Sequence, residues 1–326
     1  MQYVFYGPNF RPAYLLYSDI FRLGNVRFYK SPYRILMRKS GCGNGFERYA
    51  NGLLRKFKHP KAMRNKLFII PDISAEDRAC FVFHNPWVTH CIESGYLEVL
   101  RNRFPRAMLI ANFLDAQLAK QIDIGTVKAH YDAAYIYDEA EAVVLGIGYE
   151  PPPYSKLHDL NSIDEPEYDV SWIGVAKGRL NRLIEVYDSL DRRGVKCHFY
   201  VVGARRKDRV ERPGIVYAKR FLSDADSFEY TRTSRCLLEI GLPKTDALTS
   251  RVREAIVYNK KILSDNPRLA HMPYYAPDMV QIFEDTGSID VGFFFTNVRG
   301  YSYSGDFSPV HMLERLERDY ESIMQS

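Results

Sequence analysis

Short apolar runs alternate with amphipathic segments throughout the second half of the chain. The run D-V-S-W-I-G at 169–174 closes on Gly174, and apolar residues at helical spacing follow it as far as Gly194. Further apolar runs are V-K-C-H-F-Y-V-V-G, I-V-Y-A-K, C-L-L-E-I-G-L and K-I-L-S-D, with amphipathic stretches between them. Strands that alternate with helices in this way predict βαβ units and a parallel sheet.

The first half has the same character with a less regular pattern. Its apolar runs at 4–7, 80–84, 107–111 and 133–138 predict strands, and 89–101 and 114–121 predict helices. The segment 25–65 shows no period that assigns it. We expect a second α/β layer arrangement here.

Three prolines at 151–153, followed by an acidic, polar stretch, separate the two halves. Because 326 residues exceed one ordinary core, we predict two domains. These are 1–155 and 169–307, joined by a linker at 156–168. An apolar stripe in 308–326 predicts an amphipathic terminal helix, formed by Met312, Leu313, Leu316, Tyr320 and Ile323. The predicted fold class is α/β, with two Rossmann-like domains and a terminal helix that packs back across the hinge.

The net charge is small for a nucleic-acid-binding protein. The chain carries +5 at pH 7, and no nucleic-acid-binding module is recognisable, so we expect no nucleic-acid partner. Basic residues gather at 34–39, 55–64 and 205–212. Such blocks usually belong to solvated faces, and they also suit phosphate-bearing substrates or an anionic membrane surface.

The cysteines indicate a reducing compartment. There are five, at Cys42, Cys80, Cys91, Cys197 and Cys236, and none forms a C-x-x-C pair. The N-terminus has no basic head before an apolar core, and no apolar run approaches the roughly 20 residues that span a bilayer. We therefore predict a cytoplasmic location and leave open a peripheral contact with the inner face of the membrane.

The stretch D-A-L-T-S-R-V-R-E-A-I-V-Y-N-K-K-I-L-S-D places polar residues at the head of an otherwise apolar helix. In parallel sheets, ligands bind beyond the carboxyl ends of the strands, where helix N-termini favour phosphate. Thr249 and Ser250 suit the cap and a diphosphate, and Arg251 or Arg253 would neutralise it. Glu254 could accept hydrogen bonds from ribose hydroxyls. The alternative is an ordinary helix head with a cap, a first-turn acid and solvated arginines.

The turn I-G-V-A-K-G-R supports the first interpretation. Gly174 would allow close approach of the backbone to a ligand, and Lys177 and Arg179 would lie where a phosphate binds. The turn lacks the G-x-G-x-x-G pattern and the acid of a NAD site, and it is no Walker loop.

Two stretches of the second half together resemble the C-terminal half of bacterial GT-B glycosyltransferases. They are D-V-S-W-I-G-x(4)-R-L-x-x-L-I-x-x-Y-D-x-L and L-T-S-R-V-R-E-A-I-V-Y-N-K-K-I-L-S-D-N. The similarity is to the lipopolysaccharide and capsular polysaccharide type and to the CgeB-like group, and covers roughly 169–270. It implies that Glu254 binds the ribose and that Arg251 is the arginine of the family phrase. The family's second acid falls on Asp246, which is shorter than usual.

The resemblance implies a transfer of sugar from a nucleotide-sugar donor to a glycan or lipid-linked acceptor, as in O-antigen synthesis, without a metal or cofactor. No D-x-D motif follows a strand, and D-A-D at 224–226 is predicted to cap a helix. An inverting enzyme needs a general base. His84, at the end of F-V-F-H, is the first candidate, followed by Asp19 and Asp115. A structural role for His84 is the alternative, and a retaining enzyme needs no base there.

Two other functions stay open at this point. One is a nucleotide-sugar 2-epimerase, which would keep the fold and change the reaction. The other is a degenerate GT-B scaffold that binds a partner and catalyses nothing.

Overall fold

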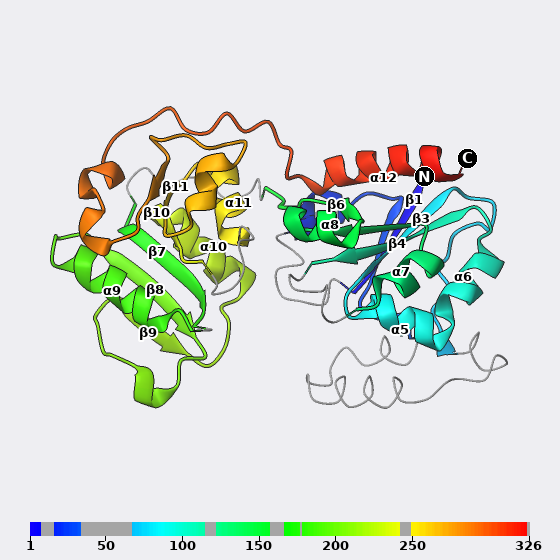
Figure 1. The fold of residues 1–326 in the computed structure, drawn as a ribbon, viewed down its shortest axis with the longest axis horizontal. Helices are drawn as coiled ribbons and strands as arrows, with labels where there is room; N and C mark the ends of the chain where they lie inside the picture. Colours follow the sequence, from blue (N-terminus) through cyan, green and yellow to red (C-terminus); the bar gives the residue numbers. More distant parts are fainter. Residues whose placement is uncertain are drawn as a thin grey trace. The chain divides into compact units, whose positions relative to one another are not determined.

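The chain folds into two compact units in a computed structural model. The structure describes residues 1–7, 16–33, 67–114, 122–156, 166–176, 178–241 and 249–324. The first unit holds the N-terminal strand, Tyr17–Pro153 and Pro309–Ser326, and the second unit holds Tyr154–Ser308. Each unit is built on its own six-stranded parallel sheet (Figure 1).

The sheet of the first unit has the strand order β2-β1-β3-β4-β5-β6. Its strands are β1 (Gln2–Tyr6), β2 (Val26–Tyr29), β3 (Ala79–His84), β4 (Ala107–Phe113), β5 (Ala133–Ile136) and β6 (Gly148–Tyr149). Every residue of β3 and β4 is buried, as expected for central strands of a parallel sheet covered on both faces. The chain order reverses between β1 and β3.

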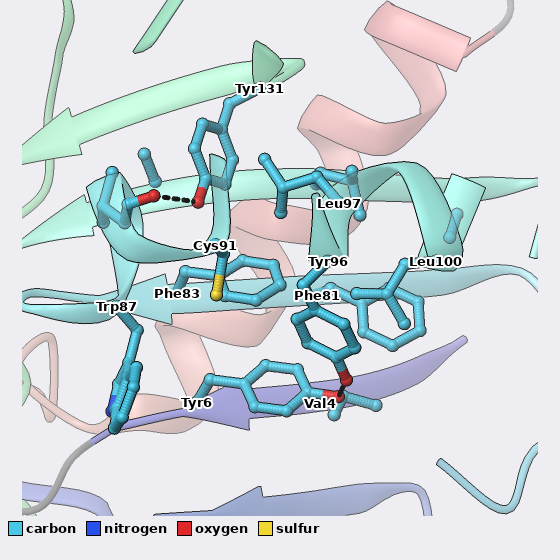
Figure 2. Close-up of a cluster of buried hydrophobic side chains, with 14 of the residues drawn as sticks. Val4, Tyr6, Phe81, Phe83, Trp87, Cys91, Tyr96, Leu97, Leu100 and Tyr131 are labelled. Atoms are coloured by element: carbon cyan, nitrogen blue, oxygen red, sulfur yellow. Dashed lines mark hydrogen bonds between the residues drawn. The ribbon is translucent and has the colours of Figure 1, made fainter. Parts of the chain in front are cut away.

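Helices α5 (Trp87–Ser94), α6 (Tyr96–Arg103), α7 (Ile124–His130) and α8 (Glu139–Leu145) lie between the strands. Figure 2 shows the core under α5 and α6, where Val4, Tyr6, Phe81 and Phe83 point from the strands toward Leu97 and Leu100. The Tyr6 and Tyr96 hydroxyls are 2.7 Å apart inside this core. The helix predicted at 89–101 is thus two helices, because Gly95 adopts φ 72° between them.

The terminal helix α12 (Pro309–Met324) packs on the first unit. The Tyr3 hydroxyl donates to the Leu313 carbonyl at 3.2 Å, and the Tyr320 hydroxyl donates to the Arg106 carbonyl at 2.8 Å. Arg315 forms a two-point ion pair with Glu150, which is 4% exposed. Four residues of the predicted stripe are buried, namely Met312, Leu313, Leu316 and Tyr320. The predicted terminal helix is therefore present.

The sheet of the second unit has the strand order β12-β11-β10-β7-β8-β9. Its strands are β7 (Tyr168–Val175), β8 (Cys197–Val202), β9 (Ile215–Ala218), β10 (Ser234–Glu239), β11 (Lys261–Ser264) and β12 (Val280–Ile282). Helices α9 (Leu180–Asp191), α10 (Asp224–Arg232) and α11 (Ser250–Val257) connect them, with short 3-10 turns including η3 (Arg206–Asp208).

Successive residues of β10 belong to two different cores. Leu238 packs with residues of α9, such as Leu183, whereas Leu237 packs with residues of α11, such as Val252 and Ile256. This alternation follows from the two-residue period of a strand with helices on both faces. The predicted fold class, α/β with two Rossmann-like domains, is confirmed.

Several predicted details differ or lie elsewhere. The cap of α10 is Ser223, whose hydroxyl accepts from the Asp226 amide, so D-A-D begins the helix rather than capping it. The segment 114–121, apart from residue 114, and the basic blocks at 34–39 and 55–64 lie outside the described residues. Across the described part of the chain, no helix has both the length and the apolar character to cross a membrane.

Candidate functional site

The reversal of strand order in the second sheet falls between β10 and β7. After β7 the chain enters α9, and after β10 it leads to α11, so the two helices diverge to opposite faces of the sheet. A crevice at the carboxyl ends of the strands forms at such a point, and open α/β sheets bind ligands there. Most of the residues predicted to bind a donor come from these two connections.

Helix α11 begins without a side-chain cap. Thr249 occupies the cap position with extended backbone, yet its hydroxyl makes no capping hydrogen bond. By contrast, Ser223 caps α10, and Asp123 and Asp138 cap α7 and α8. Ser250 follows Thr249 and is exposed. The cap residue thus leaves the first amide groups of α11 without a hydrogen bond from its side chain, which suits an anion at the positive end of the helix dipole.

Arg251 and Glu254 form an internal pair on α11. The Nη1 group of Arg251 donates to Oε2 of Glu254 at 2.5 Å, and its Nη2 group donates to the Ile173 carbonyl of β7 at 3.2 Å. The Thr231 hydroxyl donates to the other oxygen of Glu254. Glu254 is 5% exposed, and its carboxylate orients Arg251 at the switch point.

The Arg253 side chain is buried inside the second unit. It is 7% exposed, and its guanidinium lies over the Phe307 ring at 5.9 Å from the centroid. This geometry is that of a packed cation–π contact, so Arg253 is not a solvated arginine.

Arg179 joins the ends of β7 and β10. Its guanidinium donates to the Val175 carbonyl at 2.7 Å and to the Ile240 carbonyl at 3.0 Å. The Nε atom is buried and makes no hydrogen bond within the described residues. Burial lowers the pKa of Arg179, and the charges of Glu239 and Asp265 oppose this. Arg179 thus brings a cation to the switch point.

In the turn between β7 and α9, the glycine with the special backbone conformation is Gly178 rather than the predicted Gly174. Gly174 lies inside β7, which extends to Val175, and Gly178 adopts φ 85° at the turn itself. A Cβ atom on Gly174 would lie 2.8 Å from the Trp172 ring. Gly174 therefore makes room for Trp172, over which the Arg179 guanidinium stacks at 5.3 Å.

A buried acid that sequence reasoning missed, Glu239, ends β10 and is 1% exposed. Its Oε2 atom accepts from the Ser264 hydroxyl, and its Oε1 atom has no hydrogen-bond partner in the described ranges. The buried Thr249 hydroxyl likewise has no hydrogen-bond partner in the described ranges. Burial raises the pKa of Glu239, while Ser264, Arg179 and Thr249 lower it and Asp265 raises it further.

The Thr249 hydroxyl is thus close enough to affect the Glu239 carboxyl, although the two atoms do not meet the geometry of a hydrogen bond. Buried polar atoms are rarely left unpaired. Two of them at the carboxyl edge of the sheet, beside the uncapped end of α11, are suited to hold a hydroxyl group of a ligand or a water.

In the first unit, His84 ends β3 and is fully buried. Its Nδ1 atom is 3.2 Å from the Tyr6 carbonyl, and its Nε2 atom is 2.8 Å from the Tyr17 hydroxyl. Because a carbonyl only accepts, Nδ1 carries the proton and Nε2 accepts from Tyr17. Burial lowers the pKa of His84 to about 4, and the bond to Tyr6 raises it slightly. This geometry is that of a structural histidine, the alternative to a general base.

Of the other two base candidates, the structure describes Asp19 and does not describe Asp115. Asp19 is half-buried in η1 (Ser18–Ile20), a turn that packs against α12. Asp115, Lys177 and Asp246 lie outside the described residues. No group of three or more His, Cys, Asp or Glu side chains in the described ranges is arranged to hold a metal ion.

No protein-family model and no curated protein sequence matches the chain. Several solved structures do match the chain. AviGT4, a glycosyltransferase involved in avilamycin A biosynthesis, matches with a TM-score of 0.54 and 12% identity over 100% of this chain and 98% of its own. SnogD, a glycosyltransferase from Streptomyces nogalater, matches with a TM-score of 0.43 and 12% identity over 99% and 96% of the two chains.

A UDP-N-acetylglucosamine 2-epimerase described as putative, from Listeria monocytogenes, matches with a TM-score of 0.44 and 11% identity over 99% of this chain and 90% of its own. Only the first of the three similarities is strong enough to compare folds. It agrees with the two parallel six-stranded sheets and the terminal helix, and the chain has the GT-B fold.

Proposed function

We propose that this protein is a glycosyltransferase that moves a sugar from a nucleotide-sugar donor to a glycan or lipid-linked acceptor, in bacterial surface polysaccharide synthesis. The observation that carries the proposal is the convergence at the β10–β7 switch point of an uncapped helix start with Arg179 and Arg251. The residues T-S-R-V-R-E at 249–254, part of the phrase on which the family resemblance rests, form this helix start.

In this proposal the donor diphosphate lies at the start of α11. The first amide groups of α11 and the hydroxyl of Ser250 bind the oxygens of the diphosphate, and Arg179 and Arg251 balance the charge of the diphosphate. Glu254 holds Arg251 in place and takes the ribose through its remaining lone pairs, since a carboxylate accepts about four hydrogen bonds. Lys177 and Asp246 complete the donor site from the two connecting loops.

The helix dipole and the arginines would stabilise the diphosphate as it leaves the sugar, so the chemistry requires no metal. In an inverting reaction the base would come from elsewhere than His84, because both ring nitrogens of His84 are engaged inside the core. Asp19 and Asp115 are then the remaining candidates from the first unit.

A nucleotide screen tests the proposal. UDP, GDP, CMP and dTDP are added separately with EDTA, and the thermal midpoint of unfolding is followed. A ligand at 100 times its dissociation constant stabilises the folded state by about 2.7 kcal/mol. A clear shift with one nucleotide supports the donor site, and release of that nucleotide from its sugar conjugate supports catalysis. No shift with any of the four would contradict it.

A non-catalytic GT-B scaffold is the second candidate. It is favoured by the buried His84 and by the internal engagement of Glu254. It predicts a thermal shift without turnover, or no shift at all, so the same experiment separates the two.

A further inference from the structure

One short segment of the second unit carries a strong excess of positive charge. Residues 203–221 contain seven basic and two acidic residues, a net charge of +5. The formal net charge of the entire chain is also +5. The segment 34–64, which lies outside the described residues, is also basic, with nine basic residues and one acidic residue.

The segment comprises β9 and the connections on either side of it. Both connections leave from the carboxyl edge of the sheet, where the Gly203 amide donates to the Ala218 carbonyl at 3.1 Å. The Tyr217 hydroxyl accepts from the Val210 amide at 3.2 Å and donates to its carbonyl at 2.9 Å. The β8–β9 connection, which extends away from the sheet in Figure 1, is thereby held against β9.

Three of the seven cations serve the fold. Arg205 pairs with Asp208, and Arg212 pairs with Asp188 at 2.6 Å. Arg209 donates twice to the Ala204 carbonyl. The other four are exposed, and their side chains make no ion pair or hydrogen bond within the part of the chain that the structure describes. We call these four the basic edge: Arg206, Lys207, Lys219 and Arg220.

Exposed apolar side chains accompany the basic edge. Phe221 directly follows Arg220 and is 53% exposed, Val216 of β9 is 41% exposed, and Val210 is 37% exposed. A nucleic-acid duplex is bound chiefly through cations on its phosphates. Cations interspersed with exposed aromatic and aliphatic groups suit the boundary between lipid headgroups and acyl chains.

We propose that the basic edge and Phe221 dock the second unit on an anionic membrane surface, with the cations on lipid phosphates and Phe221 at the acyl boundary. Under the proposed function, this docking would bring the transferase to a lipid-borne acceptor. The membrane docking can be tested independently of the donor site, because vesicle binding and nucleotide binding are measured in separate experiments.

Co-sedimentation with vesicles tests this docking. The full chain is mixed with phosphatidylcholine vesicles that contain about one quarter phosphatidylglycerol, or none, in low salt. We expect sedimentation only with the anionic vesicles and release at high salt, because ionic screening shortens the range of the attraction. Each basic residue near the surface contributes about fivefold, so Lys219→Gln with Arg220→Gln should weaken binding about 25-fold.

The matched control removes two exposed cations from the first unit, Arg103→Gln with Arg318→Gln, and should bind like the parent. Phe221→Ser should weaken vesicle binding at every salt concentration. The proposal is overturned if the parent does not sediment with anionic vesicles, or if the basic-edge variant and the control bind alike. Tighter binding to a DNA duplex than to vesicles, unaffected by Phe221→Ser, would assign the surface to nucleic acid instead.

Discussion

Arg251 and Glu254 are one turn apart on α11 and share a hydrogen bond of 2.5 Å, with side chains only 15% and 7% exposed. The pair answers why an otherwise buried helix has a charged head. The acid fixes the arginine, and the arginine also reaches the Ile173 carbonyl across the switch point. The charged head is therefore a largely buried, internally paired structure, rather than a solvated helix end.

Glu254→Gln should destabilise the second unit. The substitution leaves Arg251 largely buried without its counter-ion, and breaking a buried pair in this way costs about 3 kcal/mol. The chain has two tryptophans, and only Trp172 lies in the second unit, so urea unfolding in a Trp87→Phe background reports this unit alone.

The double variant Arg251→Met with Glu254→Gln serves as the control. It should recover most of the lost stability and still bind nucleotide poorly, because the cation is gone. Recovery of nucleotide binding together with stability would contradict a role for Arg251 at the diphosphate.

His84 should make the first unit sensitive to acid. Its pKa is about 4 in the folded chain against 6.5 for an ordinary histidine, so the unfolded state binds more protons between these values. Stability is then full above pH 6.5, falls as the pH drops from 6.5 to 4, and loses about 3 kcal/mol in total. Trp87 fluorescence in a Trp172→Phe background follows the first unit.

His84→Gln is the matched variant for this pH dependence, because a neutral amide cannot titrate. It should flatten the difference in stability between pH 7 and pH 5. An NMR titration of the His84 ring with a midpoint near 6.5 would show instead that the ring is open to solvent and free to act as a base.

Glu239→Gln should separate stability from donor binding. The amide removes the cost of burying a charge, so the fold should be unharmed, whereas a ligand hydroxyl at Oε1 would lose a charged acceptor. Hydrogen bonds to charged groups contribute about 1.5–3 kcal/mol, which predicts at least tenfold weaker binding of the nucleotide sugar. Unchanged affinity, measured by calorimetry, would restrict Glu239 to a structural role.

The fold was predictable because the signals that determine it are local. Apolar strands such as those ending at Glu239 and His84, with helical periods between them, leave few arrangements other than parallel sheets. Strand order was not predictable from these periods, since β2, β6 and β12 are short and the pairing of β10 with β7 joins residues far apart in the chain.

The site was predictable only in part. The head of α11 stood out as polar residues on an apolar helix, and the acid inside the apolar run C-L-L-E-I-G is a comparable signal for Glu239. The burial of His84 had no local signal, because it depends on Tyr17, 67 residues away in the chain. Distant contacts of this kind decide whether a titratable residue faces a ligand or the core.

The central claim is that the start of α11 binds the diphosphate of the donor. Calorimetry of UDP, GDP and dTDP with Ser250→Pro and Ser250→Ala tests it most directly. Proline is tolerated at the first position of a helix and removes only the amide N–H, while both variants lose the hydroxyl. The account predicts that Ser250→Pro binds its nucleotide about tenfold more weakly than Ser250→Ala, the loss of one charge-assisted hydrogen bond. Equal affinity of both variants and the parent would show that the diphosphate lies elsewhere.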